Sequence, residues 1–189
     1  MKFTILLTIM AAGALAGPLH ARQNKGKAGK AAAAKGNGNA AAATGAVTKG
    51  ATTLVFKEDG GVPGNECLTF RNNGEIVDAA CVDTAADRQI TPSTLNGQNV
   101  LLVQRSFTAG FRADLVGKQA CVGNNGTTFL AQDCATATDF VTFDDASGQL
   151  VSAAGACQSG HDDAAQLTID TTGKNCATLT TTSVTATAP

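Results

Sequence analysis

The sequence predicts an all-β domain, and three observations support this. Beyond residue 50, apolar and β-branched runs are interrupted by Gly, Asn and Asp at about every eight to twelve positions, a spacing typical of short strands joined by turns. Two of the interruptions read Asn-Asn-Gly, at 72–74 and 124–126, and Asn-Gly between apolar segments is a strong hairpin signal. No sustained helical periodicity occurs in this region.

The first residues read as a secretory signal peptide, residues 1–16. Lys2 supplies a positive charge, Phe3 begins an apolar core too short to span a bilayer, and Ala14 and Ala16 are small residues of the kind found before a cleavage site. Residues 17–50 are mostly Ala, Gly, Lys and Asn. Such a segment has no face to bury, which predicts a disordered linker or propeptide ahead of a domain at 51–189. No later segment is apolar for long enough to predict a membrane span.

Charge is divided between these two parts. Residues 1–50 hold seven of the fourteen Lys and Arg and no acid, whereas residues 51–189 hold all fifteen acids. The cationic segment is either a solvated spacer or a tether to an anionic cell-wall polymer. The acidic domain would repel phosphate, so nucleic acid is not expected as a partner.

All six cysteines lie in the domain and bracket its turns in series. An even count behind a signal peptide indicates disulfides. Strands on either side of a turn bring their ends together, so we expect each bracket to close on itself. The predicted pairs are Cys67–Cys81, Cys121–Cys134 and Cys157–Cys176.

A second repeat lies between the brackets. "ITPSTLNGQNV" from Ile90 and "VTFDDASGQLV" from Val141 align without a gap and share Gly-Gln at the same offset. "LVFKEDGGV" from Leu54 is a candidate first copy, and "ATLTTTSV" from Ala177 is a candidate closing strand.

Three bracketed units joined by repeated turn segments resemble the ricin-type β-trefoil lectins, over roughly residues 52–184. Cys67-Leu68 matches the opening of that family's repeat, and Ile90 and Val141 stand where the family has Trp. The resemblance implies a β-trefoil of three disulfide-bracketed repeats preceded by a disordered tail. An eight-stranded sandwich or jelly roll is the alternative, although it predicts no threefold repeat.

The resemblance implies sugar binding, yet the sugar-site motifs are degenerate. Thr69, Gly123 and Ser159 occupy the positions of the family's carboxylate, and the chain has neither Trp nor Tyr. We therefore expect weak binding or none for simple galactosides at those positions. Ligands would be taken instead by the loop His161-Asp162-Asp163 or by the insertion at 99–119.

No enzyme motif, cofactor or metal site is expected. His161 is the one histidine of the domain, and with Asp162 and Asp163 it could hold a ligand or simply form a polar loop tip. Asn125-Gly126-Thr127 is an N-glycosylation sequon on a predicted turn.

Together these features predict a secreted, non-catalytic module that binds an extracellular glycan or protein. The alternatives are a cell-wall-associated structural or host-interaction (effector-like) protein, and a trefoil inhibitor of hydrolases acting through the loop from Arg105 to Arg112.

Overall fold

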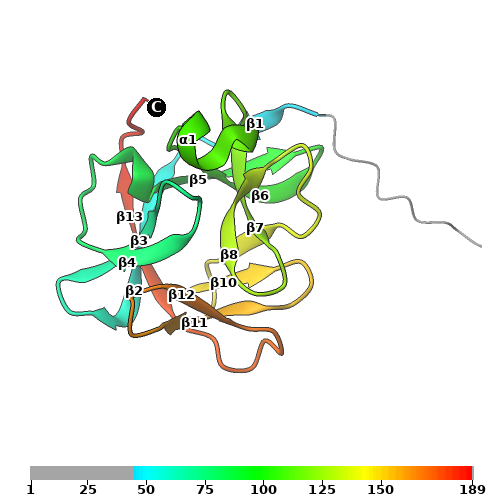
Figure 1. The fold of residues 1–189 in the computed structure, drawn as a ribbon. Coiled ribbons are helices and arrows are strands. Elements are labelled where there is room, and N and C mark those ends of the chain that lie inside the picture. Colours follow the sequence, from blue (N-terminus) through cyan, green and yellow to red (C-terminus); the bar gives the residue numbers. More distant parts are fainter. Residues whose placement is uncertain (1–44, 189) are drawn as a thin grey trace, which may run out of the picture. The chain divides into compact units, whose positions relative to one another are not determined.

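The computed structural model describes residues 45–188, all of which belong to one compact unit (Figure 1). This part of the chain has an all-β fold, as the interrupted apolar runs predicted. The strands are β1 (Val47–Lys49), β2 (Thr53–Val62), β3 (Asn65–Phe70), β4 (Ile76–Ala79), β5 (Gln89–Leu95), β6 (Gln98–Val103), β7 (Ala120–Asn124), β8 (Phe129–Asp133), β9 (Val141–Asp144), β10 (Gln149–Ser152), β11 (Cys157–His161), β12 (Leu167–Asp170) and β13 (Leu179–Val184).

The strands form two antiparallel sheets that together make a nearly closed structure. The larger has nine strands in the order β4-β3-β2-β5-β6-β7-β8, with β1 added on β5 and β13 added on β2. The smaller has the order β12-β11-β10-β9. Isolated bridges link the two, between Val77 and Gln166 and between Gly123 and Phe140.

The aligned repeats form equivalent hairpins. The segment from Ile90 is the β5–β6 hairpin, and the segment from Val141 is the β9–β10 hairpin. Asn96 and Gly97 both have positive φ in the two-residue turn between β5 and β6, which is the backbone of a hairpin turn favoured by Asn-Gly. The candidate first and closing copies lie in β2 and β13, which pair with each other from Leu179–Glu58 to Val184–Thr53.

The three predicted disulfides are present. Cys67–Cys81 staples the β3–β4 hairpin, Cys121–Cys134 the β7–β8 hairpin, and Cys157–Cys176 the β11–β12 hairpin with the loop that follows it.

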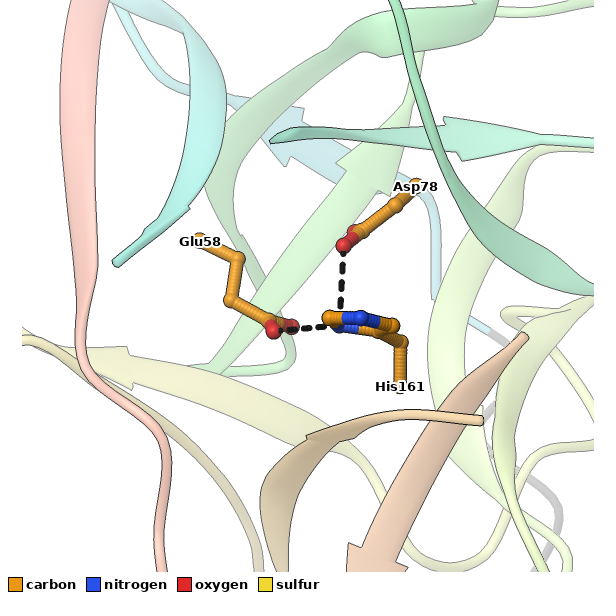
Figure 2. Close-up of side chains that lie close together, drawn as sticks. All are labelled: Glu58, Asp78 and His161. Atoms are coloured by element: carbon orange, nitrogen blue, oxygen red, sulfur yellow. Dashed lines mark hydrogen bonds and ion pairs between the residues drawn. The ribbon is translucent and has the colours of Figure 1, made fainter. Parts of the chain in front are cut away.

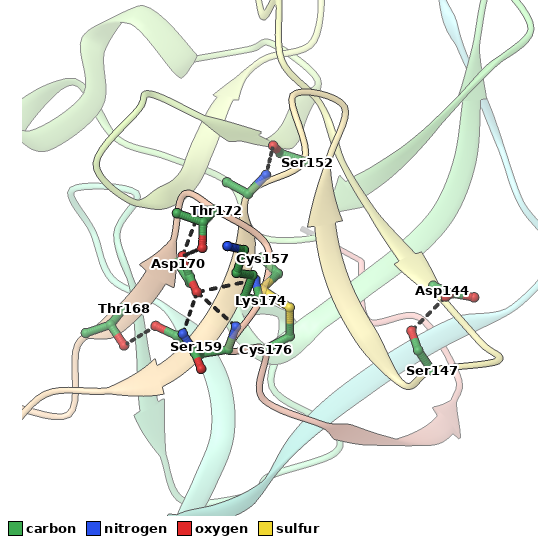
Figure 3. The surroundings of a disulfide bond; sticks show 12 residues. Asp144, Ser147, Ser152, Cys157, Ser159, Thr168, Asp170, Thr172, Lys174 and Cys176 are labelled. Carbon is green, nitrogen blue, oxygen red and sulfur yellow. Dashed lines mark hydrogen bonds between the residues drawn. A yellow bond between two sulfur atoms is a disulfide. The ribbon is translucent and has the colours of Figure 1, made fainter. Parts of the chain in front are cut away.

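That last loop is held by one carboxylate. Asp170 accepts hydrogen bonds from the backbone N–H groups of Thr172 and Asn175 and from the Thr172 hydroxyl (Figure 3). These donors favour the ionised carboxylate and hold the pKa of Asp170 well below its usual range. These hydrogen bonds therefore hold the loop between Asp170 and Cys176 in one conformation.

The core fills the space between the sheets. Phe56, Phe70 and Phe129 are fully buried at its centre. Ile90 and Val141, the aliphatic residues at the positions where the resembled family has Trp, are buried in the same cluster. A second cluster joins Val100 and Phe140 to the disulfide sulfurs of the β7–β8 hairpin.

One domain boundary was wrong. The predicted disordered segment 17–50 includes residues 45–50, of which Val47–Lys49 form β1 and pair with Leu95–Ser93 of β5. Val47 is buried in the second cluster, because an apolar β-branched residue can add a short strand even to a polar stretch. The domain thus begins ahead of residue 51. The predicted signal peptide 1–16 and the remainder of the linker, 17–44, lie outside the described residues.

The insertion at 99–119 supplies the one α-helix among residues 45–188, the short α1 (Ala109–Arg112), and the 3₁₀ turn η2 (Ala113–Leu115) follows it directly. A second 3₁₀ turn, η1 (Ala86–Arg88), precedes β5. Within residues 45–188, no helix has the length and apolar character needed to cross a membrane.

Two disulfides provide a matched test of this packing. Cys121–Cys134 and Cys67–Cys81 close loops of nearly equal length, with separations of 13 and 14, so loop closure should stabilise the domain by about 3 kcal/mol in each case. Cys121 and Cys134 are both buried, whereas Cys81 is exposed. We expect the double variant Cys121→Ala/Cys134→Ala to lose at least about 1 kcal/mol more unfolding free energy in urea than Cys67→Ala/Cys81→Ala, because it removes two buried sulfurs, whereas the other variant removes only the buried sulfur of Cys67. Equal losses would show that the second cluster is loosely packed.

Candidate functional site

The geometry of β11 turns His161 toward the interior of the molecule. Gln158 faces Ile169 of β12, Gly160 faces Thr168, and Ser159 is an additional residue between these pairs. In a regular strand, residues three apart point to opposite faces. The extra residue of a β-bulge changes that alternation, so Gln158 and His161 can both reach the same partner, Glu58 of β2.

Glu58, Asp78 of β4 and His161 form a compact cluster (Figure 2). His161 Nδ1 donates to Glu58 Oε1 at 2.8 Å and lies 3.3 Å from Asp78 Oδ2. Gln158 Nε2 donates to the other Glu58 oxygen at 2.6 Å. The Glu58 and Asp78 side chains are 4% and 1% exposed, whereas His161 is 24% exposed and forms the solvent side of the cluster.

Burial and the neighbouring negative charge both shift the pKa values of the cluster. Desolvation, reinforced by the neighbouring Glu58 carboxylate, raises the pKa of Asp78 to about 6. The hydrogen bond to Glu58 raises the pKa of His161, and the charges of Glu58, Asp78 and Asp162 act in the same direction. The cluster therefore retains protons at pH values where the same groups in an unfolded chain would release them.

The three residues of the predicted ligand-binding loop, His161, Asp162 and Asp163, have different surroundings in the structure. His161 enters the cluster, whereas Asp162 caps the β11–β12 turn by accepting hydrogen bonds from the N–H groups of Ala164 and Gln166. Asp163 is exposed. The partners of His161 are thus Glu58 and Asp78, which sequence reasoning did not single out.

A second feature lies on the surface, where the insertion meets the first Asn-Asn-Gly turn. Arg105 donates to Phe70 O and Asn72 Oδ1, and Arg112 donates to Asn73 O and Ala131 O. Gly74 carries a positive φ, and a Cβ there would lie 2.3 Å from Arg112 Nη1. The positive φ of Gly74 favours glycine at this position, and the hydrogen bonds of Arg112 hold α1 against the turn.

With α1 held against the turn in this way, Phe111 on the same helix is exposed to solvent. Its side chain is 62% exposed, the highest value among the exposed large apolar residues in the described part of the chain. With Arg71, Asn72 and Asn73 it lines a hollow of about 340 Å³. The amide oxygens of Asn72 and Asn73 accept hydrogen bonds from Arg105 and from Glu75 N–H. Their NH₂ groups make no hydrogen bond within residues 45–188 and are available to a ligand.

At the three positions where the resembled lectins carry a sugar-binding carboxylate, the residues of this chain are occupied by local contacts. The Thr69 hydroxyl donates to Cys67 O and is buried, and the Ser159 hydroxyl shares a hydrogen bond with that of Thr168. Gly123 is buried, and a Cβ there would meet the Gln132 side chain at 2.4 Å. None of the three presents a charged group.

Asn125 lies on the exposed turn that was predicted. Its side-chain oxygen accepts from the hydroxyl and the N–H of Thr127 and from the N–H of Thr128. The sequon is accessible on the surface.

Compared with known proteins, the chain matches no protein-family model, no curated protein and no solved structure. Its function must therefore be inferred from its own residues.

The cluster makes the stability of the domain depend on pH in a defined direction. Because the folded pKa of Asp78, about 6, exceeds its ordinary 3.8, the folded state binds more protons than the unfolded state between these values, and stability falls as pH rises through this window. The raised pKa of His161 continues the fall above 6.5. We expect unfolding free energy in metal-free buffer to drop by on the order of 2–3 kcal/mol between pH 4.5 and 8, measured by urea denaturation.

The charged groups facing this pair are Glu58, Glu66 and Asp162, and all three are acids that favour proton uptake. Asp78→Asn should flatten the curve below pH 7, and the exposed Asp163→Asn should leave it unchanged. A stability that rises steadily from pH 5 to 8 in the unaltered protein would contradict this assignment.

Proposed function

We propose that this protein is a secreted, non-catalytic binding module with a β-trefoil architecture, and that it binds an extracellular glycan through the surface around Phe111. The observation that carries the proposal is a largely exposed aromatic ring on a helix held in place by two arginines, beside two free amide donors.

The strand pairings support the trefoil. Three disulfide-stapled hairpins, β3–β4, β7–β8 and β11–β12, alternate along the chain with β2, β5–β6, β9–β10 and β13. The hairpins also contact one another, through bridges joining Glu75 to Leu130 and Val77 to Gln166. A trefoil needs three hairpins that meet in this way, and the three cysteine brackets of the sequence supply three candidates.

The chemistry of the surface supports a glycan. Sugar rings present an apolar C–H face and several hydroxyls, so they are held by an aromatic face together with amide hydrogen-bonding groups. Phe111 supplies the ring, and the Asn72 and Asn73 NH₂ groups supply donors. The positions of the ricin-type carboxylate, in contrast, supply no charge.

Secretion is supported by chemistry as well as by the leader-like segment. Three disulfides persist in an oxidising compartment, and every one of the six cysteines is used. The Lys-rich segment would then attract an anionic wall polymer electrostatically. A wall-associated role is therefore compatible with glycan binding by the domain.

The inhibitor alternative is less well supported. An inhibitory arginine has to extend into the pocket of its target enzyme. Arg105 and Arg112 instead direct their guanidinium groups to carbonyl oxygens of their own chain.

We expect Phe111→Ala to weaken glycan binding about 2- to 12-fold, the factor that corresponds to a stacking contribution of ~0.5–1.5 kcal/mol, with little change in stability because the ring is exposed. Glycan-array screening followed by calorimetry with the best ligand would measure it. Val82→Ala removes another exposed apolar side chain and is the matched control. Full binding by Phe111→Ala, with loss in a Thr69→Ala or Ser159→Ala variant, would place the site at the positions that correspond to the ricin-type sugar sites instead.

Passage through the secretory pathway should modify Asn125. When the protein is expressed in a eukaryotic host with its own leader, Asn125→Gln should remove one glycosidase-sensitive mass increment, because the sequon lies on an exposed turn. Thr127→Ala should have the same effect without altering the asparagine. An unmodified Asn125 in secreted protein would contradict the prediction.

A further inference from the structure

The Glu58–Asp78–His161 cluster contains more negative charge than its neighbours balance. Two carboxylates are almost fully buried there, and His161 is the one basic side chain paired with either of them within residues 45–188. A protonated His161 would neutralise a single carboxylate. Buried charge without a partner is strongly unfavourable, so such sites recruit either a proton or a cation.

One buried carboxylate oxygen of this cluster makes no hydrogen bond. Asp78 Oδ2 is buried and makes no hydrogen bond, although it lies 3.3 Å from His161 Nδ1, whose proton goes to Glu58. The Gln158 side-chain oxygen is also buried without a hydrogen bond. Nearly all buried polar atoms in proteins have a partner, so an orphaned carboxylate oxygen beside an imidazole indicates a missing ligand.

We propose that Glu58, Asp78 and His161 together bind one divalent first-row metal ion of the zinc type. Each contributes a ligand atom, and these atoms all lie within 4.8 Å of one another. Adjacent ligands of a tetrahedral zinc are separated by roughly 3.4 Å when its bonds are about 2.1 Å long. The Asp78–His161 distance of 3.3 Å already matches, and the Glu58–His161 distance of 2.8 Å must open by about half an ångström once the shared proton leaves.

The donor set determines the class of ion. An imidazole nitrogen with two carboxylate oxygens suits Zn²⁺ and its first-row neighbours, whereas Ca²⁺ and Mg²⁺ prefer all-oxygen sites with more ligands. His161 is partly exposed, so a water molecule can complete the coordination from the solvent side.

Two glycines lie beside the ligand oxygens. Gly61 and Gly160 flank the cluster on the irregular parts of β2 and β11. A Cβ at Gly61 would lie 3.0 Å from Asp78 Oδ2, and one at Gly160 would lie 3.7 Å from Glu58 Oε1. Gly160 also has a φ of 123°, which side chains rarely adopt. Gly61 thus keeps a side-chain carbon away from the Asp78 oxygen, whereas a Cβ at Gly160 would make an ordinary contact with Glu58, and it is the positive φ of Gly160 that favours glycine there.

The test is isothermal titration calorimetry of ZnCl₂ into the chelator-treated full chain at pH 7.5. A His20→Ala background removes the second histidine of the sequence, and no free cysteine is present to compete. We expect one Zn²⁺ per chain, and affinity for CaCl₂ at least about 100-fold weaker. His161→Gln and Asp78→Asn should each lower Zn²⁺ affinity by at least about 100-fold, more than is usual for loss of an outer-shell group. Asp163→Asn, next to the site in sequence but exposed, should bind like the parent.

Absorption by bound Co²⁺ distinguishes metal ligation by His161 from a purely structural role of this residue in the fold. The parent should acquire the intense visible bands of four-coordinate Co²⁺, and His161→Gln should lose them while retaining its near-ultraviolet circular dichroism. If Asp78→Asn does not fold, Glu58→Gln takes its place. Absence of Zn²⁺ binding by the parent, or unchanged affinity in folded His161→Gln, would overturn the proposal.

Discussion

Strand β13 pairs with β2 over six residues, and this pairing joins the two ends of the domain into a nearly closed structure. β2 also pairs with β3 and β5, so it connects the first hairpin to the rest of the larger sheet. Phe56 on β2 lies in the centre of the core, and Glu58, two residues further on the same face, enters the buried cluster. Core packing and the polar cluster therefore depend on the same strand, and Leu179 of β13 fixes the position of Glu58.

The cluster lies where regular pairing is interrupted. Between Lys57 and Val62, β2 departs from its register with β3, and β11 bulges beside Gly160. A regular strand could not place Gln158 and His161 on one partner. Bulges that redirect side chains are common beside functional sites, and here two of them converge on a pair of buried carboxylates. Buried ion pairs seldom repay their desolvation in full, which is the physical reason to assign a ligand to this arrangement.

Local chemistry explains what could be predicted from the sequence. Asn-Gly turns and bracketing cysteines act over fewer than twenty residues, so the hairpins and their disulfides followed from spacing alone. β1 was missed because Val47 is a single apolar residue in an Ala/Gly/Lys-rich stretch, and its partner strand lies far along the chain. His161 was recognised, but its neighbours Asp162 and Asp163 were assigned to it because they adjoin it in sequence. Glu58 offered a signal that was not used: an acid two residues after Phe56, on the face that alternation buries.

The measurement that tests the functional account most directly is an amide-resolved NMR titration of the folded domain with the best-binding glycan. Binding through the aromatic surface predicts that the largest shift changes lie in two segments, Arg71–Gly74 and Ala109–Arg112, which are far apart in sequence and joined by the contacts of Arg105 and Arg112. Shift changes centred on Thr69, Gly123 or Ser159, with Phe111 and its neighbours unaffected, would contradict it.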